Sequence, residues 1–92
     1  MKAIEVIKTG SELLKKNKIL THILDAELLL SKTLSQSREE ILINLDKKIN
    51  DKKFSIYNKY LNRRSRNEPM AYILGEKEFW SKKFKVNKDT LI

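Results

Sequence analysis

One stretch decides the fold of this 92-residue chain: residues 21–34, THILDAELLLSKTL. When this stretch forms an α-helix, its apolar side chains point in almost every direction, because leucines fill positions 28–30 and 34 after Glu27. Thr21 stands where a helix N-cap residue is expected. A helix that is apolar nearly all round needs neighbours on all sides. We therefore predict that it begins after Thr21 and lies buried at the centre of a helical bundle.

The sequence on either side of this stretch predicts two further helices. Residues 2–16 place apolar side chains on one wide stripe at helical period, while lysines and glutamates take the other side. Ser37 and Glu40 have the spacing of a capping box, in which each side chain accepts a hydrogen bond from the other residue's backbone N–H. They predict the start of a short helix that carries Ile41, Leu42 and Leu45.

The second half of the chain predicts two more helices and then a change of period. Asn50 caps a helix whose repeat is Phe54, Tyr57, Leu61 and Arg64. Pro69 favours the first turn of a short fifth helix, residues 70–74, and we expect Gly75 to end it with a positive φ. Beyond Gly75 polar and apolar residues alternate, which indicates two short strands. The expected fold is mainly α: a small bundle of about five helices over residues 1–75, then a short C-terminal β-hairpin over residues 76–92.

The composition excludes several classes of site. Cysteine is absent, histidine occurs once at His22, and only two glycines are present, so neither a Cys/His metal centre nor a glycine-rich phosphate loop is expected. We expect no metal, cofactor or catalytic residue in this chain, and we interpret His22 as a surface or capping residue. No apolar run approaches the ~20 residues that span a bilayer, and no secretory signal is present. These features indicate a soluble cytoplasmic protein.

Positive charge is concentrated in the second half of the chain. Residues 1–46 carry seven basic and seven acidic side chains, whereas residues 47–92 carry thirteen basic and five acidic ones, which accounts for the net charge of +8. Such an excess is typical of proteins that bind nucleic acid, the ribosome or an acidic partner. A composition rich in lysine, asparagine and isoleucine is equally typical of A/T-rich coding DNA, so this alternative stays open.

Three of the four arginines cluster at the predicted end of the fourth helix. A guanidinium binds phosphate or carboxylate through two parallel hydrogen bonds, which lysine does not do. Cations at a helix C-terminus are also favoured by the helix dipole without any ligand. We expect a partner-facing or inter-domain surface made of Lys59, Arg63, Arg64 and Arg66. Five aromatic residues of this half follow helical and strand periods, so we expect them in the core rather than stacked on bases. They are Tyr57, Tyr60, Tyr72, Phe79 and Trp80.

Several motifs resemble one enzyme family. Arg63-Arg64, the run Glu68-Pro69-Met70-Ala71-Tyr72-Ile73-Leu74-Gly75 and then Glu78-Phe79-Trp80 are similar to the N-terminal domain of HemK/PrmC-type release-factor glutamine methyltransferases. The run Asp25-Ala26-Glu27-Leu28-Leu29-Leu30 resembles the second-helix signature of that family. Phe84, Val86 and Thr90-Leu91-Ile92 match the residues that precede its Pro-Arg-Pro segment, whereas Lys82-Lys83 depart from its less charged turn.

The resemblance implies an enzyme in two parts. The helical domain would be joined by the hairpin to a missing Rossmann-like domain that binds S-adenosylmethionine. That domain methylates the Gln side chain in the Gly-Gly-Gln loop of peptide chain release factors. Its cofactor loop and Asn-Pro-Pro-Tyr motif would lie beyond Ile92, because Pro69 is the one proline here.

This chain is then expected to be the non-catalytic, monomeric domain that recognises the release factor. It would also contact its own catalytic domain, and meet nucleic acid only indirectly, via the ribosome. A free-standing basic helical module that binds RNA or the ribosome is the alternative, and a purely structural interaction domain is a third reading.

Overall fold

The structure, a computed structural model, describes residues 1–75 of the chain. This part is mainly helical, which confirms the predicted class. The helices are α1 (Ala3–Lys16), α2 (His22–Leu34), α3 (Arg38–Leu42), α4 (Asp51–Ser65) and α5 (Met70–Gly75). None of these five helices is long and apolar enough to cross a membrane. The predicted hairpin over residues 76–92 lies outside the described residues.

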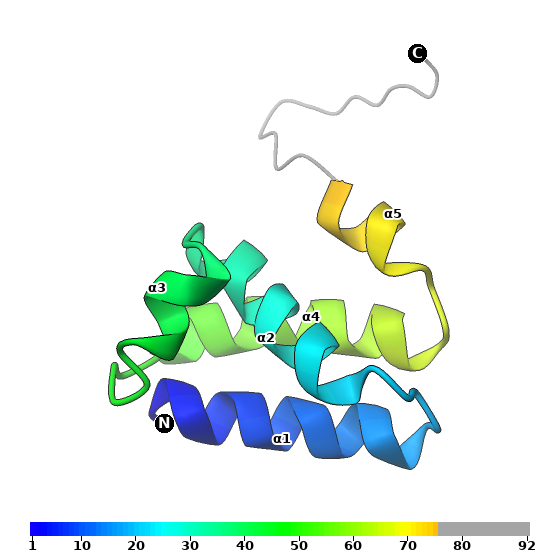
Figure 1. Cartoon of the computed structure of the whole chain (residues 1–92), viewed down its shortest axis with the longest axis horizontal. Helices are drawn as coiled ribbons and strands as arrows, with labels where there is room; N and C mark the ends of the chain where they lie inside the picture. Colours follow the sequence, from blue (N-terminus) through cyan, green and yellow to red (C-terminus); the bar gives the residue numbers. More distant parts are fainter. Residues whose placement is uncertain (76–92) are drawn as a thin grey trace.

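α2 lies at the centre of the bundle, as predicted. α1, α3, α4 and α5 all pack against it, and Figure 1 shows α1 and α4 running side by side, with α2 crossing α4. Its inward side chains Ala26, Leu29 and Leu30 are fully buried. The prediction that α2 is apolar and covered on all sides is wrong at its start, where Ile23 is 57% and Leu24 42% exposed. Within residues 1–75, the four neighbouring helices leave this side of the first turn uncovered.

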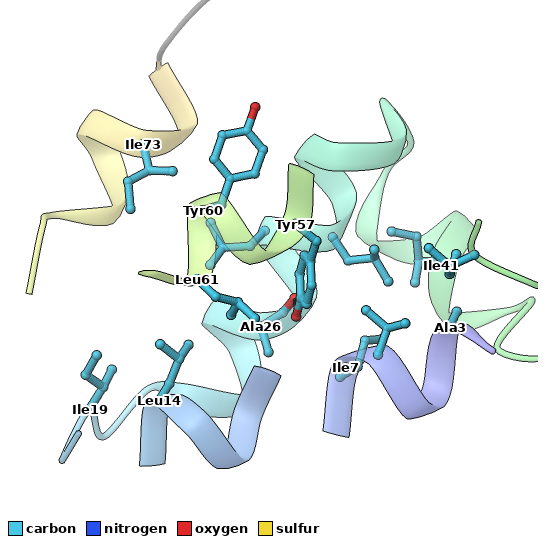
Figure 2. Packing of buried hydrophobic residues seen from close by; sticks show 14 residues of the cluster. Ala3, Ile7, Leu14, Ile19, Ala26, Ile41, Tyr57, Tyr60, Leu61 and Ile73 are labelled. Atoms are coloured by element: carbon cyan, nitrogen blue, oxygen red, sulfur yellow. Dashed lines mark hydrogen bonds between the residues drawn. The ribbon is translucent and has the colours of Figure 1, made fainter. Parts of the chain in front are cut away.

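The core takes side chains from all five helices and is centred on Tyr57. Tyr57 is the largest fully buried side chain, and Figure 2 shows its ring standing among the aliphatic side chains. The prediction of a core position is confirmed for Tyr57 and Tyr60 and is wrong for Tyr72, which is 70% exposed. For Phe79 and Trp80 it lies outside the described residues. The buried apolar residues are Ala3, Val6, Ile7, Leu14, Ile19, Ala26, Leu29, Leu30, Ile41, Ile49, Tyr57, Tyr60, Leu61 and Ile73.

The helix ends agree in part with the expected caps. Ser37 and Glu40 form the predicted capping box at α3, and the Asn50 side chain accepts a 2.8 Å hydrogen bond from the Lys53 N–H at α4. Thr21 precedes α2 but its side chain makes no cap hydrogen bond, and its hydroxyl donates to the Asp25 carboxylate. Gly75 is the last residue of α5 and has no positive φ, so its expected role in ending that helix is wrong.

The start of α1 is held by the connection between α3 and α4. The Ala3 N–H donates to the Lys47 carbonyl oxygen over 2.8 Å, and the Ile4 N–H donates to the Leu45 carbonyl oxygen over 3.0 Å. The first N–H groups of a helix have no partner within the helix itself. The connection therefore supplies acceptors that the sequence next to α1 lacks.

Candidate functional site

The candidate site is the C-terminal part of α4 together with the turn that leads into α5. The spacing of residues along a helix puts Lys59 and Arg63 on one side of α4, and Arg66, the C-cap residue that follows the helix, continues this spacing. The same spacing puts Arg64 on the side that carries Tyr57 and faces the core. The predicted four-residue cluster is thus divided between two sides of one helix.

Arg64 turns into the bundle and is bonded on both ends of its guanidinium. Its Nε donates to Asp25 Oδ2 over 2.9 Å, and its Nη1 donates to the Glu68 carbonyl oxygen over 2.9 Å. The side chains of Arg64 and Asp25 are 16% and 5% exposed. Asp25 Oδ2 also accepts a 2.8 Å hydrogen bond from the Thr21 hydroxyl. These partners keep the carboxylate from being a buried unpaired charge, which would be strongly unfavourable.

Arg63 lies at the edge of the same turn and binds the side chain of Glu68. Its Nε and Nη2 donate to the two carboxylate oxygens over 3.0 and 2.5 Å, a bidentate arrangement that fits the planar guanidinium. The hydrogen bond from Arg63 is the main reason that the pKa of Glu68 lies below its ordinary value of 4.5. Part of the positive charge of Arg63 is therefore already balanced within the domain.

Lys59 on the outer face of α4 and Arg66 at its C-cap are both exposed. Neither takes part in the ion pairs found within residues 1–75. The structure thus brings Arg63 and Arg64 together around Glu68 and leaves Lys59 and Arg66 facing outward. We call Lys59, Arg63 and Arg66 the basic face of α4.

Sequence reasoning missed Asp25, Thr21 and Glu68, which hold the arginines in place. Asp25 did carry a signal, since it is a lone carboxylate among the apolar residues at the start of α2. A buried carboxylate calls for a cationic or hydrogen-bonding partner. Its partner lies 39 residues further along the chain, so local pattern does not identify Arg64.

The single histidine joins α1 to α2. The Ser11 hydroxyl oxygen and His22 Nδ1 are 2.7 Å apart. A nucleophile and base of this kind also need a third group that orients the imidazole. Among residues 1–75 no carboxylate is found hydrogen-bonded to His22. The same part of the chain holds no group of three His, Asp or Glu side chains able to bind a metal ion.

Similarity to known proteins covers almost the whole chain. The chain is 41% identical over 88 residues to a bifunctional methyltransferase of Rickettsia felis. The aligned region covers 96% of this chain and 17% of that protein. It is 35% identical over 89 residues to the release factor glutamine methyltransferase of Leptospira interrogans, covering 97% and 31% of the two chains. Against the release factor glutamine methyltransferase of Haemophilus influenzae it is 44% identical over 82 residues, covering 89% and 28%.

The chain spans less than a third of the length of these three relatives. No solved structure is significantly similar to it. The family model of the PrmC N-terminal domain matches residues 5–75, which include every helix of the bundle apart from the first two residues of α1. Because that match covers well over half of its residues, the chain belongs to the PrmC N-terminal domain family.

Proposed function

We propose that this chain is the release-factor-recognition domain of a methyltransferase that acts on the Gln of the Gly-Gly-Gln loop in peptide chain release factors. The observation that carries the proposal is the family match over residues 5–75. Relatives that bear the name release factor glutamine methyltransferase support it. In this proposal residues 1–75 form the recognition domain, and residues 76–92 lead to a catalytic domain that binds S-adenosylmethionine. The domain itself contributes no catalytic or cofactor-binding residue.

The physical role of such a domain is to position the substrate. Methyl transfer gains most when the nucleophile is aligned with the methyl group that it attacks. Contacts far from the reacting atoms supply binding energy that is used for this alignment. A recognition domain of this size would enlarge the protein interface toward the roughly 1,600 Å² of a standard complex.

The basic face of α4 is the surface that we assign to the release factor. Lys59 and Arg66 are exposed and carry charges that acidic side chains of a partner would attract. Arg63 lies on the same side and retains part of its exposure, at 29%. Arg64 belongs to the proposed surface indirectly, because it holds the turn beside this face through Asp25 and Glu68.

Charge reversal tests this assignment in the full-length enzyme. We expect Lys59→Glu with Arg66→Glu to raise the KM for the release factor by roughly threefold to tenfold, as befits two exposed charges, with kcat nearly unchanged. The effect should shrink as salt rises, because salt screens exposed charges. Lys8→Glu with Lys15→Glu is the matched control, since these exposed lysines on α1 have the same seven-residue spacing. An equal rise in KM for both double variants, or no change in KM for either, would contradict the assignment.

The sequence downstream of Ile92 tests the enzymatic part of the proposal. We expect a glycine-rich cofactor loop followed by an Asn-Pro-Pro-Tyr motif. A reading frame that continues without them would rule out the proposed reaction. The 92-residue chain alone is expected to show no S-adenosylmethionine binding by calorimetry, and micromolar binding would contradict its non-catalytic role.

A module that binds RNA or the ribosome is the second candidate, and the basic face of α4 is the observation that favours it. Phosphate contacts release counterions, so RNA affinity would fall steeply with salt. Titrating the chain with release factor and with RNA at two salt concentrations separates the two candidates. Tighter, strongly salt-dependent binding of RNA would favour this second one.

A further inference from the structure

α5 is too small to hold its own position. It has six residues, and Ile73 is its one buried side chain. Isolated helices of this length do not persist in water, because few hydrogen bonds offset the entropy of forming the first turn. The direction of α5 must therefore be set by contacts outside the helix.

A chain of polar contacts links the turn before α5 to the first turn of α2. The Thr21 hydroxyl binds Asp25, Asp25 binds Arg64, and Arg64 binds the Glu68 carbonyl oxygen, with each distance between 2.8 and 2.9 Å. The Glu68 N–H donates back to the Arg63 carbonyl oxygen over 3.2 Å. Asn67 between them has a φ of 72°, so the chain reverses sharply at this point. Three helices are thus connected at one turn.

Such a buried ion pair is better suited to fixing geometry than to adding stability. Removing two charges from water offsets most of their mutual attraction, and an apolar pair of similar volume is often as stable. A guanidinium with fixed donors, however, accepts only a few arrangements of its partners. Arg64 uses two of these donors to hold a carboxylate of α2 and a main-chain oxygen next to α5 at the same time.

We propose that Asp25 and Arg64 are positioning residues that fix the direction of α5 against α2 and α4, and with it the direction in which the chain leaves the bundle at Gly75. Most of the core around Tyr57 comes from α1, α2 and α4, and α1 packs against both α2 and α4 without this link. Losing the link therefore releases α5 while the bundle stays folded. The consequence for methylation rests on the proposed function: the link would set how the recognition domain stands relative to the catalytic domain.

Amide hydrogen exchange of the 92-residue chain tests the proposal without any reference to activity. The reporters are the N–H groups of Tyr72 and Ile73, which donate to the Pro69 carbonyl oxygen over 3.0 and 3.3 Å. In Arg64→Met we expect their exchange to accelerate about tenfold or more, as for the loss of charged hydrogen bonds. The N–H of Leu30, in the core of α2, should change by less than about threefold, since it lies outside the link. Arg64→Lys keeps the positive charge but lacks the planar guanidinium with its fixed donors, so the acceleration of exchange should be intermediate.

Arg38→Met is the matched control, because the Arg38–Glu27 pair joins α2 to α3 over 2.6 Å and does not involve α5. It should leave the exchange of Tyr72 and Ile73 unchanged. Asp25→Asn, which has nearly the same shape as the native residue, provides the same comparison if Arg64→Met fails to fold. Equal acceleration of α5 and core amides would show a general structural role, and unchanged α5 amides would show no role. Either result would overturn the proposal and leave the release-factor assignment standing.

Discussion

The hydroxyl group of Tyr57 occupies the space in which a side chain at Gly10 would lie. A Cβ atom at Gly10 would overlap the hydroxyl oxygen and come within 3.1 Å of Leu61 Cδ2. The same hydroxyl donates a 2.9 Å hydrogen bond to the Ala26 carbonyl oxygen. One side chain of α4 therefore fixes the distances to both α1 and α2.

Gly10→Ala is expected to destabilise the domain. Ala is favoured over Gly in a helix by about 1 kcal/mol, but overpacking against Tyr57 and Leu61 costs about 1–3 kcal/mol, so the free energy of unfolding should fall. Urea denaturation followed by circular dichroism measures the change. Gly75→Ala is the control, because within residues 1–75 no atom beyond its chain neighbours and its own helix backbone lies within 4 Å of a Cβ there. In a Tyr57→Phe background Gly10→Ala should cost less, and an undiminished cost would show that the hydroxyl is not the obstacle.

Tyr57 is expected to make the domain less stable at alkaline pH. Burial, and then the negative charge of Glu27, raise the pKa of Tyr57 above its ordinary value of 10.0. Above pH 10 the unfolded chain therefore loses this proton while the folded chain keeps it, and stability falls by up to about 1.4 kcal/mol per pH unit. Tyr57→Phe should flatten this fall while costing about 0.5–1.5 kcal/mol at neutral pH. Tyr72→Phe, at an exposed position, should keep the wild-type slope in urea denaturation across pH.

Glu68 is expected to contribute to the response at acid pH. Arg63 lowers the pKa of Glu68 in the folded state. The ionised carboxylate therefore stabilises the fold at pH values above the ordinary pKa of 4.5. That contribution is lost as pH falls through the lowered pKa, when the folded carboxylate takes up a proton. Glu68→Gln should remove this part of the acid dependence, and Glu39→Gln, at an exposed site outside the ion pairs of residues 1–75, should not. Stability curves of Glu68→Gln and wild type that stay parallel at acid pH would contradict the prediction.

Ser37→Ala is expected to weaken the start of α3. The Ser37 hydroxyl accepts a 3.1 Å hydrogen bond from the Glu40 N–H, and the Glu40 carboxylate accepts one of 2.8 Å from the Ser37 N–H. Loss of an N-cap side chain costs about 1 kcal/mol. Ser55→Ala, on the exposed side of α4, is the control and should be neutral or slightly stabilising. Thermal unfolding of the two variants measures the difference, and equal stabilities would indicate that the cap contributes little.

The sequence by itself determined the helices of residues 1–75 and most of their ends. The capping box at Ser37 and the cap at Asn50 were readable because they act over three residues. The periodic apolar residues of α1 and α4 marked their inward faces for the same reason. The motifs around residues 68–75 also indicated the family, which the match over residues 5–75 confirms.

Only the tertiary structure decided which residues meet. The four cations near the end of α4 were equivalent in the sequence. In the bundle Arg64 points inward, where it binds Asp25 of α2, a residue 39 positions away in the chain. Thr21 looked like a cap, but in the bundle its hydroxyl donates to the same carboxylate and makes no cap hydrogen bond. Nothing in the sequence around Gly10 indicated that a side chain would not fit there. The close approach of Tyr57 from α4 excludes one. Each of these outcomes depends on how distant helices approach one another, and no local pattern carries that information.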